Sequence, residues 1–188
     1  ATLGLFLAAS SLIDLLQIKV IAYILLHYII ALLGCNINSY SDYDVDKLYK
    51  TYMSDGVDTL GKKLLKRLIV VEAILAIFLI SYFFISGLVI ASLLAIIGFF
   101  AAILYSVEPV RIKKHGLISP LPVIILYSFP ILGGWFVFNS SINWIFFVFV
   151  IGYVLLNEGF TLVNTCEDFS EDKQKNILTW AHLFGLRK

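Results

Sequence analysis

The chain contains a series of apolar segments, each close to the length that crosses a lipid bilayer. A helix needs ~20 predominantly apolar residues to span the hydrocarbon core. The candidate segments are Thr2 to Leu16, Val20 to Ile37, Leu68 to Ile85, Leu88 to Tyr105, Leu117 to Phe138 and Trp144 to Val163. Only 14% of the residues are charged, against about a quarter in a soluble domain. Because lipid cannot satisfy backbone polar groups, these segments predict an all-α bundle of about six transmembrane helices.

The two ends of the chain differ from the middle. The first apolar segment is short, contains Asp14 and begins with Ala rather than Met, so we expect a membrane helix that lacks its start. The segment from Asn176 to Lys188 is typical of the beginning of a further helix. We therefore expect residues 1–188 to form a single transmembrane domain without its N-terminal start and its last helices.

Positive charge is distributed unevenly between the turns. Of the 14 Lys and Arg residues, only Lys19 lies in a turn that joins segments 1 and 2, 3 and 4, or 5 and 6. The others lie in residues 47–67, 111–114 and 173–188. With six spans those three stretches share one face, and the positive-inside rule makes it cytoplasmic. Both visible termini then fall on this face, where the active-site cavity is expected to open. The net charge of +1 indicates no nucleic-acid partner.

A polar stretch, "NINSYSDYDVDK", directly follows the second apolar segment. Asn38, Asp42 and Asp46 recur at intervals of four residues, which places them on one face if the helix continues past Ile37. Asp44 then points roughly the opposite way and is expected to be either a surface carboxylate or one that supports the ligating residues from behind. We call Asn38, Asp42 and Asp46 the first triplet.

The same spacing returns at the end of the sixth apolar segment, in Asn164, Asp168 and Asp172, the second triplet. Four aspartates on neighbouring helix ends repel one another, and divalent cations relieve that repulsion. Carboxylate and amide oxygens suit Mg²⁺, which keeps coordination positions open for water and substrate phosphates. The two triplets therefore predict a site that binds a diphosphate through metal ions. The alternative is two solvated acidic helix ends.

The loop between the fourth and fifth segments, "YSVEPVRIKKHG", supplies positive charge. Arg111, Lys113 and Lys114 are candidates for holding phosphate oxygens, and Arg offers bidentate geometry. They could equally be topology-determining charges of a cytoplasmic loop. Lys47 and Lys50 have the same two interpretations.

These motifs, in this order, resemble those of the UbiA superfamily of intramembrane prenyltransferases. The resemblance covers essentially the whole chain: the first triplet, the stretch from Tyr105 through Pro109 to Lys113, the Asp168–Asp172 pair, and "KNILTWAHLFGLRK". Three features depart from the family pattern. Lys50-Thr51 replaces an Arg-Pro pair, Glu171 replaces a common Gly, and about six spans are present instead of eight or nine.

The resemblance implies transfer of an isoprenyl group from a prenyl diphosphate to an aromatic or lipid acceptor within the membrane. Two Mg²⁺ ions would be held by the residues of both triplets, with Asp42, Asp168, Arg111 and Lys113 carrying catalysis. The residues expected to bind substrate are Asn38, Tyr105, Arg111, Lys113, Lys50 and Asn164.

Two other functions remain open. One is a membrane terpene cyclase on the same scaffold, in which the prenyl chain itself captures the cation. The other is a non-catalytic role in binding lipid or transporting a cation. Glu158, inside the sixth segment, is interpreted either as an acceptor-site residue or as a protonated, hydrogen-bonded structural residue, because ionisable groups within membrane helices usually face a cavity.

Overall fold

The computed structural model describes residues 1–49, 51–174 and 177–185. Long apolar helices dominate it: α2 (Ile18–Tyr49), α4 (Lys62–Ile85), α5 (Val89–Ser106), α6 (Leu121–Phe136) and α7 (Trp144–Glu167). Each of the five, with α6 counted from Gly116, is long and apolar enough to cross a membrane. The described residues contain no β-strand, so the predicted all-α multispan fold is confirmed.

The first predicted span, Thr2 to Leu16, is wrong. This stretch forms α1 (Thr2–Ala8) and a separate 3₁₀ turn, η1 (Ile13–Leu16), so five spanning helices are described instead of six. The Asp14 carboxylate accepts hydrogen bonds from the backbone N–H and the hydroxyl of Ser11 and from the Gln17 amide. Such local side-chain bonds compete with a continuous helix.

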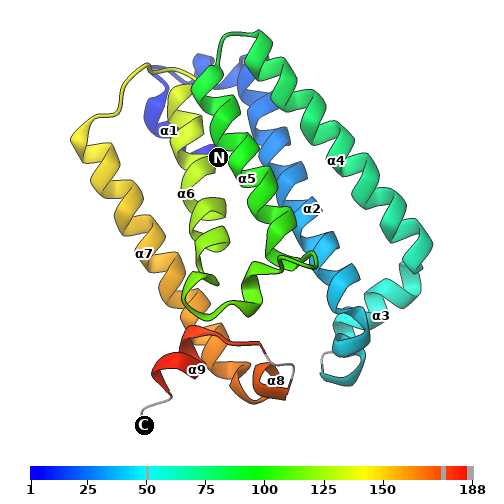
Figure 1. Ribbon diagram of the computed structural model, residues 1–188. Coiled ribbons are helices and arrows are strands. Elements are labelled where there is room, and N and C mark those ends of the chain that lie inside the picture. The colour runs from blue at the N-terminus through cyan, green and yellow to red at the C-terminus, as the bar shows by residue number, and fades with distance from the viewer. Residues whose placement is uncertain (50, 175–176, 186–188) are drawn as a thin grey trace.

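The position of α1 also corrects the predicted topology. Ala1 lies beside Gly134, in the half of α6 that is remote from the polar loops (Figure 1). The prediction that both visible termini lie at the polar end is therefore wrong for Ala1. Lys19 lies at the far end as well, where its ammonium group donates to the carbonyl of Val137 at 3.2 Å.

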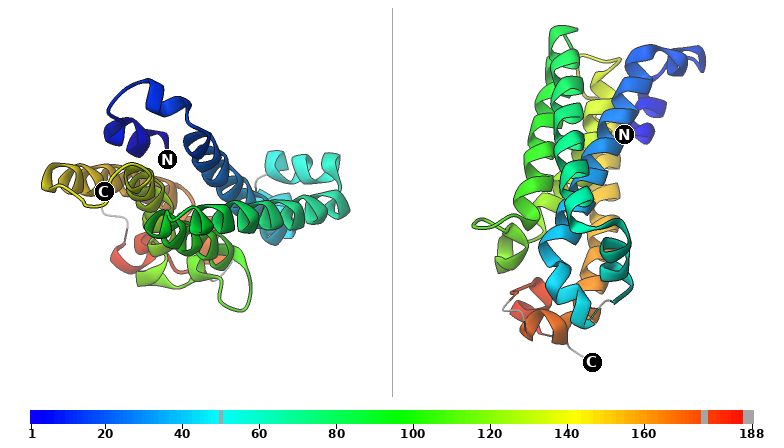
Figure 2. Two further views of the ribbon diagram at one scale, coloured as in Figure 1. Left: turned by 90° about the horizontal axis from the view of Figure 1, so that it is seen from above. Right: turned by 90° about the vertical axis from the view of Figure 1, so that its right-hand side faces the viewer.

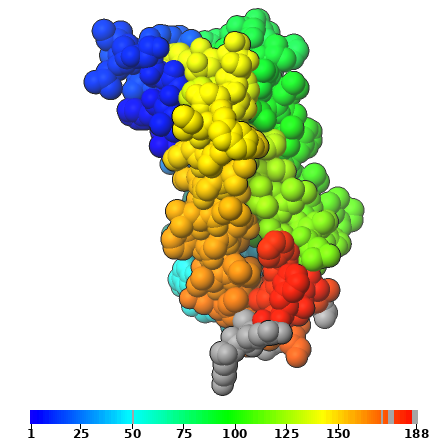
Figure 3. Space-filling model, turned by 90° about the vertical axis from the view of Figure 1, so that its left-hand side faces the viewer, coloured from blue at the N-terminus to red at the C-terminus, as the bar shows by residue number. Residues whose placement is uncertain are grey.

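The helices form an elongated array in which α4 and α7 lie at opposite ends, with α2, α5 and α6 between them (Figure 2). Small residues allow close packing along α5: the Cβ of Ala102 lies 3.4 Å from where a Cβ on Gly34 of α2 would stand. Helix α7 packs on α6 through Trp135 and Phe146, whose rings stack at 4.2 Å. Its remaining surface forms much of one side of the molecule (Figure 3).

The polar loops gather at one end of the array (Figure 1). They comprise α3 (Thr51–Leu60), the 3₁₀ turns η2 (Ile112–Lys114) and η3 (Gly116–Ile118), α8 (Phe169–Gln174) and α9 (Trp180–Phe184). We call residues 107–116, which carry Arg111, Lys113 and Lys114, the basic loop. The segment before α9 is attached to it, because the Gly116 N–H donates to the Leu178 carbonyl at 2.8 Å. Both triplets and the basic loop therefore lie at the same end of the bundle.

The contact between α2 and α6 depends on Gly133. The hydroxyl of the fully buried Tyr23 donates to the Pro130 carbonyl at 3.2 Å, and a Cβ on Gly133 would lie only 2.1 Å from that hydroxyl. We expect Gly133→Ala to lower the free energy of unfolding by about 1–3 kcal/mol, the usual cost of overpacking. Thermal unfolding in detergent measures this.

Gly152→Ala is the matched control, because nothing lies within 4 Å of its Cβ position on α7. Alanine there should leave stability unchanged or raise it by up to ~1 kcal/mol through helix propensity. Equal melting temperatures for the two variants would contradict the packing described for Tyr23.

Candidate functional site

The first triplet lies on a continuous helix, as predicted, because α2 extends through Tyr49. Residues four apart share one face of α2, so Asp42 and Asp46 lie on one face and Asp44 lies on another. Asp46 is only 6% exposed, whereas the side chain of Asp44 is 88% exposed and pairs with Lys62 at 3.3 Å. Of the two roles expected for Asp44, the structure shows the surface carboxylate.

The second triplet spans the junction of two helices. Asn164 belongs to α7, Asp168 is the residue that ends this helix, and Asp172 belongs to α8. Backbone hydrogen bonds continue across the junction, from Asp168 N–H to the Asn164 carbonyl at 3.0 Å and from Asp172 N–H to the Asp168 carbonyl at 2.9 Å. The chain thus keeps a helical turn here although α7 has ended.

All six triplet residues line one cleft of about 280 Å³ at the polar end of the bundle. Tyr105, near the end of α5, and Lys113, in the loop that follows this helix, line the same cleft. Residues 126 positions apart in the sequence, such as Asp42 and Asp168, are thereby brought to a common cavity. Lys50, the remaining residue predicted to bind substrate, lies outside the described residues.

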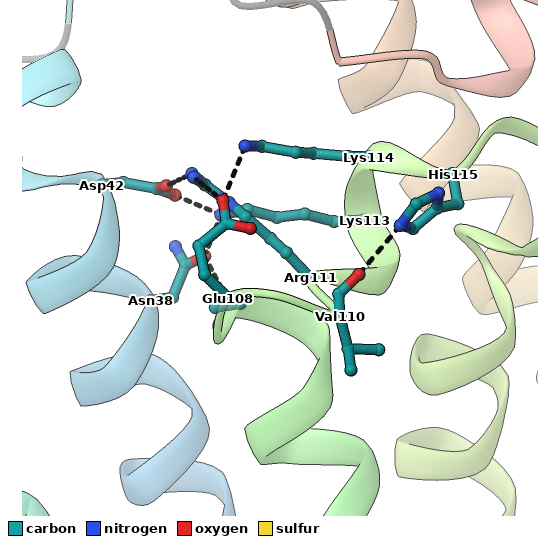
Figure 4. A network of polar contacts seen from close by, with 9 residues as sticks. Asn38, Asp42, Glu108, Val110, Arg111, Lys113, Lys114 and His115 are labelled. Atoms are coloured by element: carbon teal, nitrogen blue, oxygen red, sulfur yellow. Dashed lines mark hydrogen bonds and ion pairs between the residues drawn. The ribbon is translucent and has the colours of Figure 1, made fainter.

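The basic loop bonds directly to the first triplet (Figure 4). Asp42 forms ion pairs with both Arg111 and Lys113, and the Lys113 ammonium also donates to the Asn38 amide oxygen at 2.7 Å. The three charged side chains are only 10–15% exposed. Burial lowers the pKa of Lys113, and the neighbouring Asp42 opposes that shift.

The local backbone directs these side chains. Arg111 has φ of +34°, the left-handed conformation, and is the one non-glycine residue with positive φ in the described part of the chain. Such strained residues concentrate at functional sites. Arg111 also pairs with Glu108 at 3.0 Å, and so bridges two carboxylates.

Glu108 and Ser106 are site residues that no motif in the sequence indicated. The Ser106 hydroxyl donates to the Asn38 amide oxygen at 2.8 Å. Glu108 pairs with Lys114 at 2.7 Å as well as with Arg111, and hydrogen bonds from Lys114 and Arg111 lower its pKa. Lys114 is therefore directed to Glu108 instead of Asp42. The one signal in the sequence was proximity to Tyr105 and Arg111.

Two further cavities adjoin the cleft. The larger, about 410 Å³, shares Asn38 and Tyr105 with the cleft, has mostly apolar walls and reaches His27. Since His27 precedes Asn38 by eleven residues on α2, this cavity extends ~16 Å along the bundle. The smaller, about 170 Å³, shares Tyr105 and Lys113 with the cleft and contains Glu158. Tyr105 thus lies where all three cavities meet.

The donor chemistry of the cleft fits Mg²⁺. Mg²⁺ is commonly held by one or two carboxylates, with water and substrate phosphates completing its octahedron. Each triplet supplies two carboxylates and one amide oxygen to the cleft. Within the described ranges, no three His, Cys, Asp or Glu side chains converge closely enough to hold an ion by themselves.

Comparison with known proteins identifies one family. The model of the UbiA prenyltransferase family matches residues 1–188, the whole chain. Neither curated proteins nor solved structures give a match.

Proposed function

The chain belongs to the UbiA prenyltransferase family, and from this premise we propose that it uses Mg²⁺ to transfer an isoprenyl group from a prenyl diphosphate to an aromatic or lipid acceptor. Family membership, together with five apolar helices, makes it an integral membrane protein and a prenyltransferase in the broad sense. The metal, the donor and the acceptor are our proposal.

One observation carries the proposal: a polar cleft and an apolar cavity meet at Asn38 and Tyr105. A prenyl diphosphate has the same division, with a charged head and a hydrocarbon tail. The cleft offers oxygen ligands and the cations of the basic loop, whereas the apolar cavity offers burial for the tail. The carbon that changes bonding partner would then lie near Tyr105.

The charged residues have complementary tasks. Arg111 and Lys113, which pair with Asp42 in this structure, would turn their donors to the diphosphate oxygens when the donor substrate enters. Bound Mg²⁺ would neutralise charge on the leaving diphosphate. The carboxylates of both triplets would hold the metal, and Asn38 and Asn164 would add amide oxygens.

The dry cavity protects the reaction. Prenyl transfer that passes through an allylic cation fails if water captures the cation first. The walls of the larger cavity are mostly apolar, and a prenyl tail that fills it would displace water. The excess of Lys and Arg in the loops at this end supports a cytoplasmic position for the cleft.

A single assay tests the proposal. Membranes containing the complete protein are incubated with a labelled C20 prenyl diphosphate and a panel of aromatic and glyceryl lipid acceptors, with Mg²⁺ or with EDTA. We expect labelled product that requires both Mg²⁺ and an acceptor, with no product in EDTA. Excess Mg²⁺ added after EDTA should restore it.

The other outcomes identify the alternatives. Labelled product that forms without any acceptor indicates a terpene cyclase. No product in any arm, combined with ion uptake by proteoliposomes, indicates a transporter and contradicts the proposal.

A further inference from the structure

The smaller cavity is lined by a carboxylate that has one oxygen without a hydrogen-bond partner in the described part of the protein. Glu158 projects into it from α7, and its Oε1 atom is buried without a hydrogen-bond partner. Buried carboxylate oxygens nearly always accept a hydrogen bond, because leaving one unsatisfied costs the full desolvation penalty. The cavity therefore has room for a donor, and the carboxylate needs one.

Two of the hydroxyl groups around Glu158 form hydrogen bonds within α7. Thr161 donates to the Asn157 carbonyl at 3.1 Å, and Thr165 donates to the Leu162 carbonyl at 2.8 Å. Both threonines line the same cavity, on the same side of α7 as Glu158.

Two donor groups on the opposite wall also form hydrogen bonds elsewhere. The Trp180 ring N–H donates to the Leu117 carbonyl at 3.2 Å, and the Ser119 hydroxyl donates to the Gly116 carbonyl at 2.9 Å. The segment that carries Trp180 lies beside the polar half of α7 (Figure 3). Within the described part of the chain, neither these groups nor the other lining side chains, Tyr105 and Lys113 included, donate to Oε1, and a ligand with a hydrogen-bond donor would satisfy it.

The position of the cavity indicates which ligand. It shares Tyr105 and Lys113 with the diphosphate cleft, whereas the hydrocarbon tail has the larger apolar cavity to itself. A molecule whose polar group rests on Glu158 would lie next to the reacting end of the prenyl donor. At about 170 Å³ the cavity holds the head of a small molecule, since whole drug-sized ligands occupy ~300 Å³ or more.

We propose that this cavity is the acceptor site and that Glu158 selects an uncharged acceptor by accepting a hydrogen bond from its hydroxyl group. The inference rests on the proposed prenyl transfer and specifies the acceptor class. A carboxylate on the acceptor would meet the charge of Glu158 at close range and be repelled. Acceptors that present an acid group to Glu158 are therefore disfavoured.

The test uses two probes that differ in this feature. Hydroquinone and 4-hydroxybenzoate are para-substituted phenols that carry a hydroxyl and a carboxylate, respectively. Equilibrium binding of each to the complete purified protein is measured with Mg²⁺ and an unreactive prenyl thiodiphosphate. We expect the wild type to bind hydroquinone at least about tenfold more tightly than 4-hydroxybenzoate, because the carboxylate of 4-hydroxybenzoate would share this small cavity with the carboxylate of Glu158.

Glu158→Gln keeps the size of the side chain and removes its charge. It should weaken hydroquinone binding by about tenfold and abolish the preference between the probes. Glu167→Gln is the matched control: it lies nine residues further along α7, on the opposite face, and is exposed. This variant should bind both probes as the wild type does. Melting temperatures verify that both variants are folded.

The outcomes separate this inference from the proposed function. Unchanged binding in Glu158→Gln, or equal affinity of the wild type for both probes, overturns the assignment of Glu158 even if prenyl transfer occurs. Binding that depends on Glu158, in a protein that transfers no prenyl group to any acceptor, retains the site and overturns the proposed function.

Discussion

Asp168→Ala is expected to abolish prenyl transfer, with a loss of at least about 100-fold in turnover, the scale on which removal of a key electrostatic group acts. Asp168, from the second triplet, lines the same cleft as Asp42. Without it, the cleft loses one of the carboxylates proposed to hold the metal and the diphosphate. The measurement is the rate of labelled product formation at saturating donor and Mg²⁺.

The first triplet needs a gentler substitution. Asp42 is buried between Arg111 and Lys113, and removal of one partner from a buried ion pair costs about 3–5 kcal/mol in stability. A loss of activity in Asp42→Ala could therefore come from the missing carboxylate or from unfolding, and the assay would not distinguish them. Asp42→Asn keeps the shape and an acceptor oxygen, and we expect the same loss of turnover with a folded protein.

Asp44→Ala is the control for both variants. It removes one carboxylate, from the same helix as Asp42, but its side chain is 88% exposed and outside the cleft. Turnover should remain within about threefold of the wild type, since surface charge changes have small effects. Full activity in Asp168→Ala or Asp42→Asn would contradict the proposal that both triplets hold the metal.

The second large effect is expected at Lys113. Its ammonium group bonds both Asn38 and Asp42 and is 10% exposed, so it is positioned to meet a phosphate oxygen in the cleft. Lys113→Met keeps the length of the side chain and removes the charge. We expect kcat/KM for the prenyl diphosphate to fall by about 100-fold, because a buried charge-assisted hydrogen bond is lost.

Lys114→Met is the matched control, because the neighbouring lysine pairs with Glu108 outside the cleft. In each variant the carboxylate that loses its lysine still pairs with Arg111, so the disturbance of local ion pairs is comparable. We expect Lys114→Met to stay within about threefold of the wild type. Equal losses in the two variants would mean that only overall loop charge matters.

The sequence predicted the first triplet well because helical periodicity is a local property. An interval of four residues fixes which side chains share a face once the backbone is helical, and this separated Asp46 from Asp44 correctly. It predicted the second triplet less completely, because α7 ends at Glu167. Hydrogen bonds of the Asp168 and Asp172 backbones preserve the turn, and periodicity does not report them.

The prediction that the first segment spans the membrane was wrong for a reason that hydropathy does not measure. Thr2 to Leu16 is apolar overall, but Asp14 binds Ser11 and Gln17 locally and replaces a helix with a turn. An average over a window counts Asp14 as one unfavourable residue and misses its hydrogen bonds. The predicted position of Ala1 failed with it, because topology depends on the number of spans.

By itself the sequence determined the class of fold, the helical spacing of both triplets and the polar end at which they lie, because hydrophobic length and periodicity act along the chain. Only the tertiary structure decided which charges meet. In the structure Arg111 and Lys113 pair with Asp42, and Lys114 pairs with Glu108. One oxygen of Glu158 lies in a cavity without a hydrogen-bond partner. Those pairings depend on how separate helices pack, and three-dimensional distance between helices is not encoded in any local pattern.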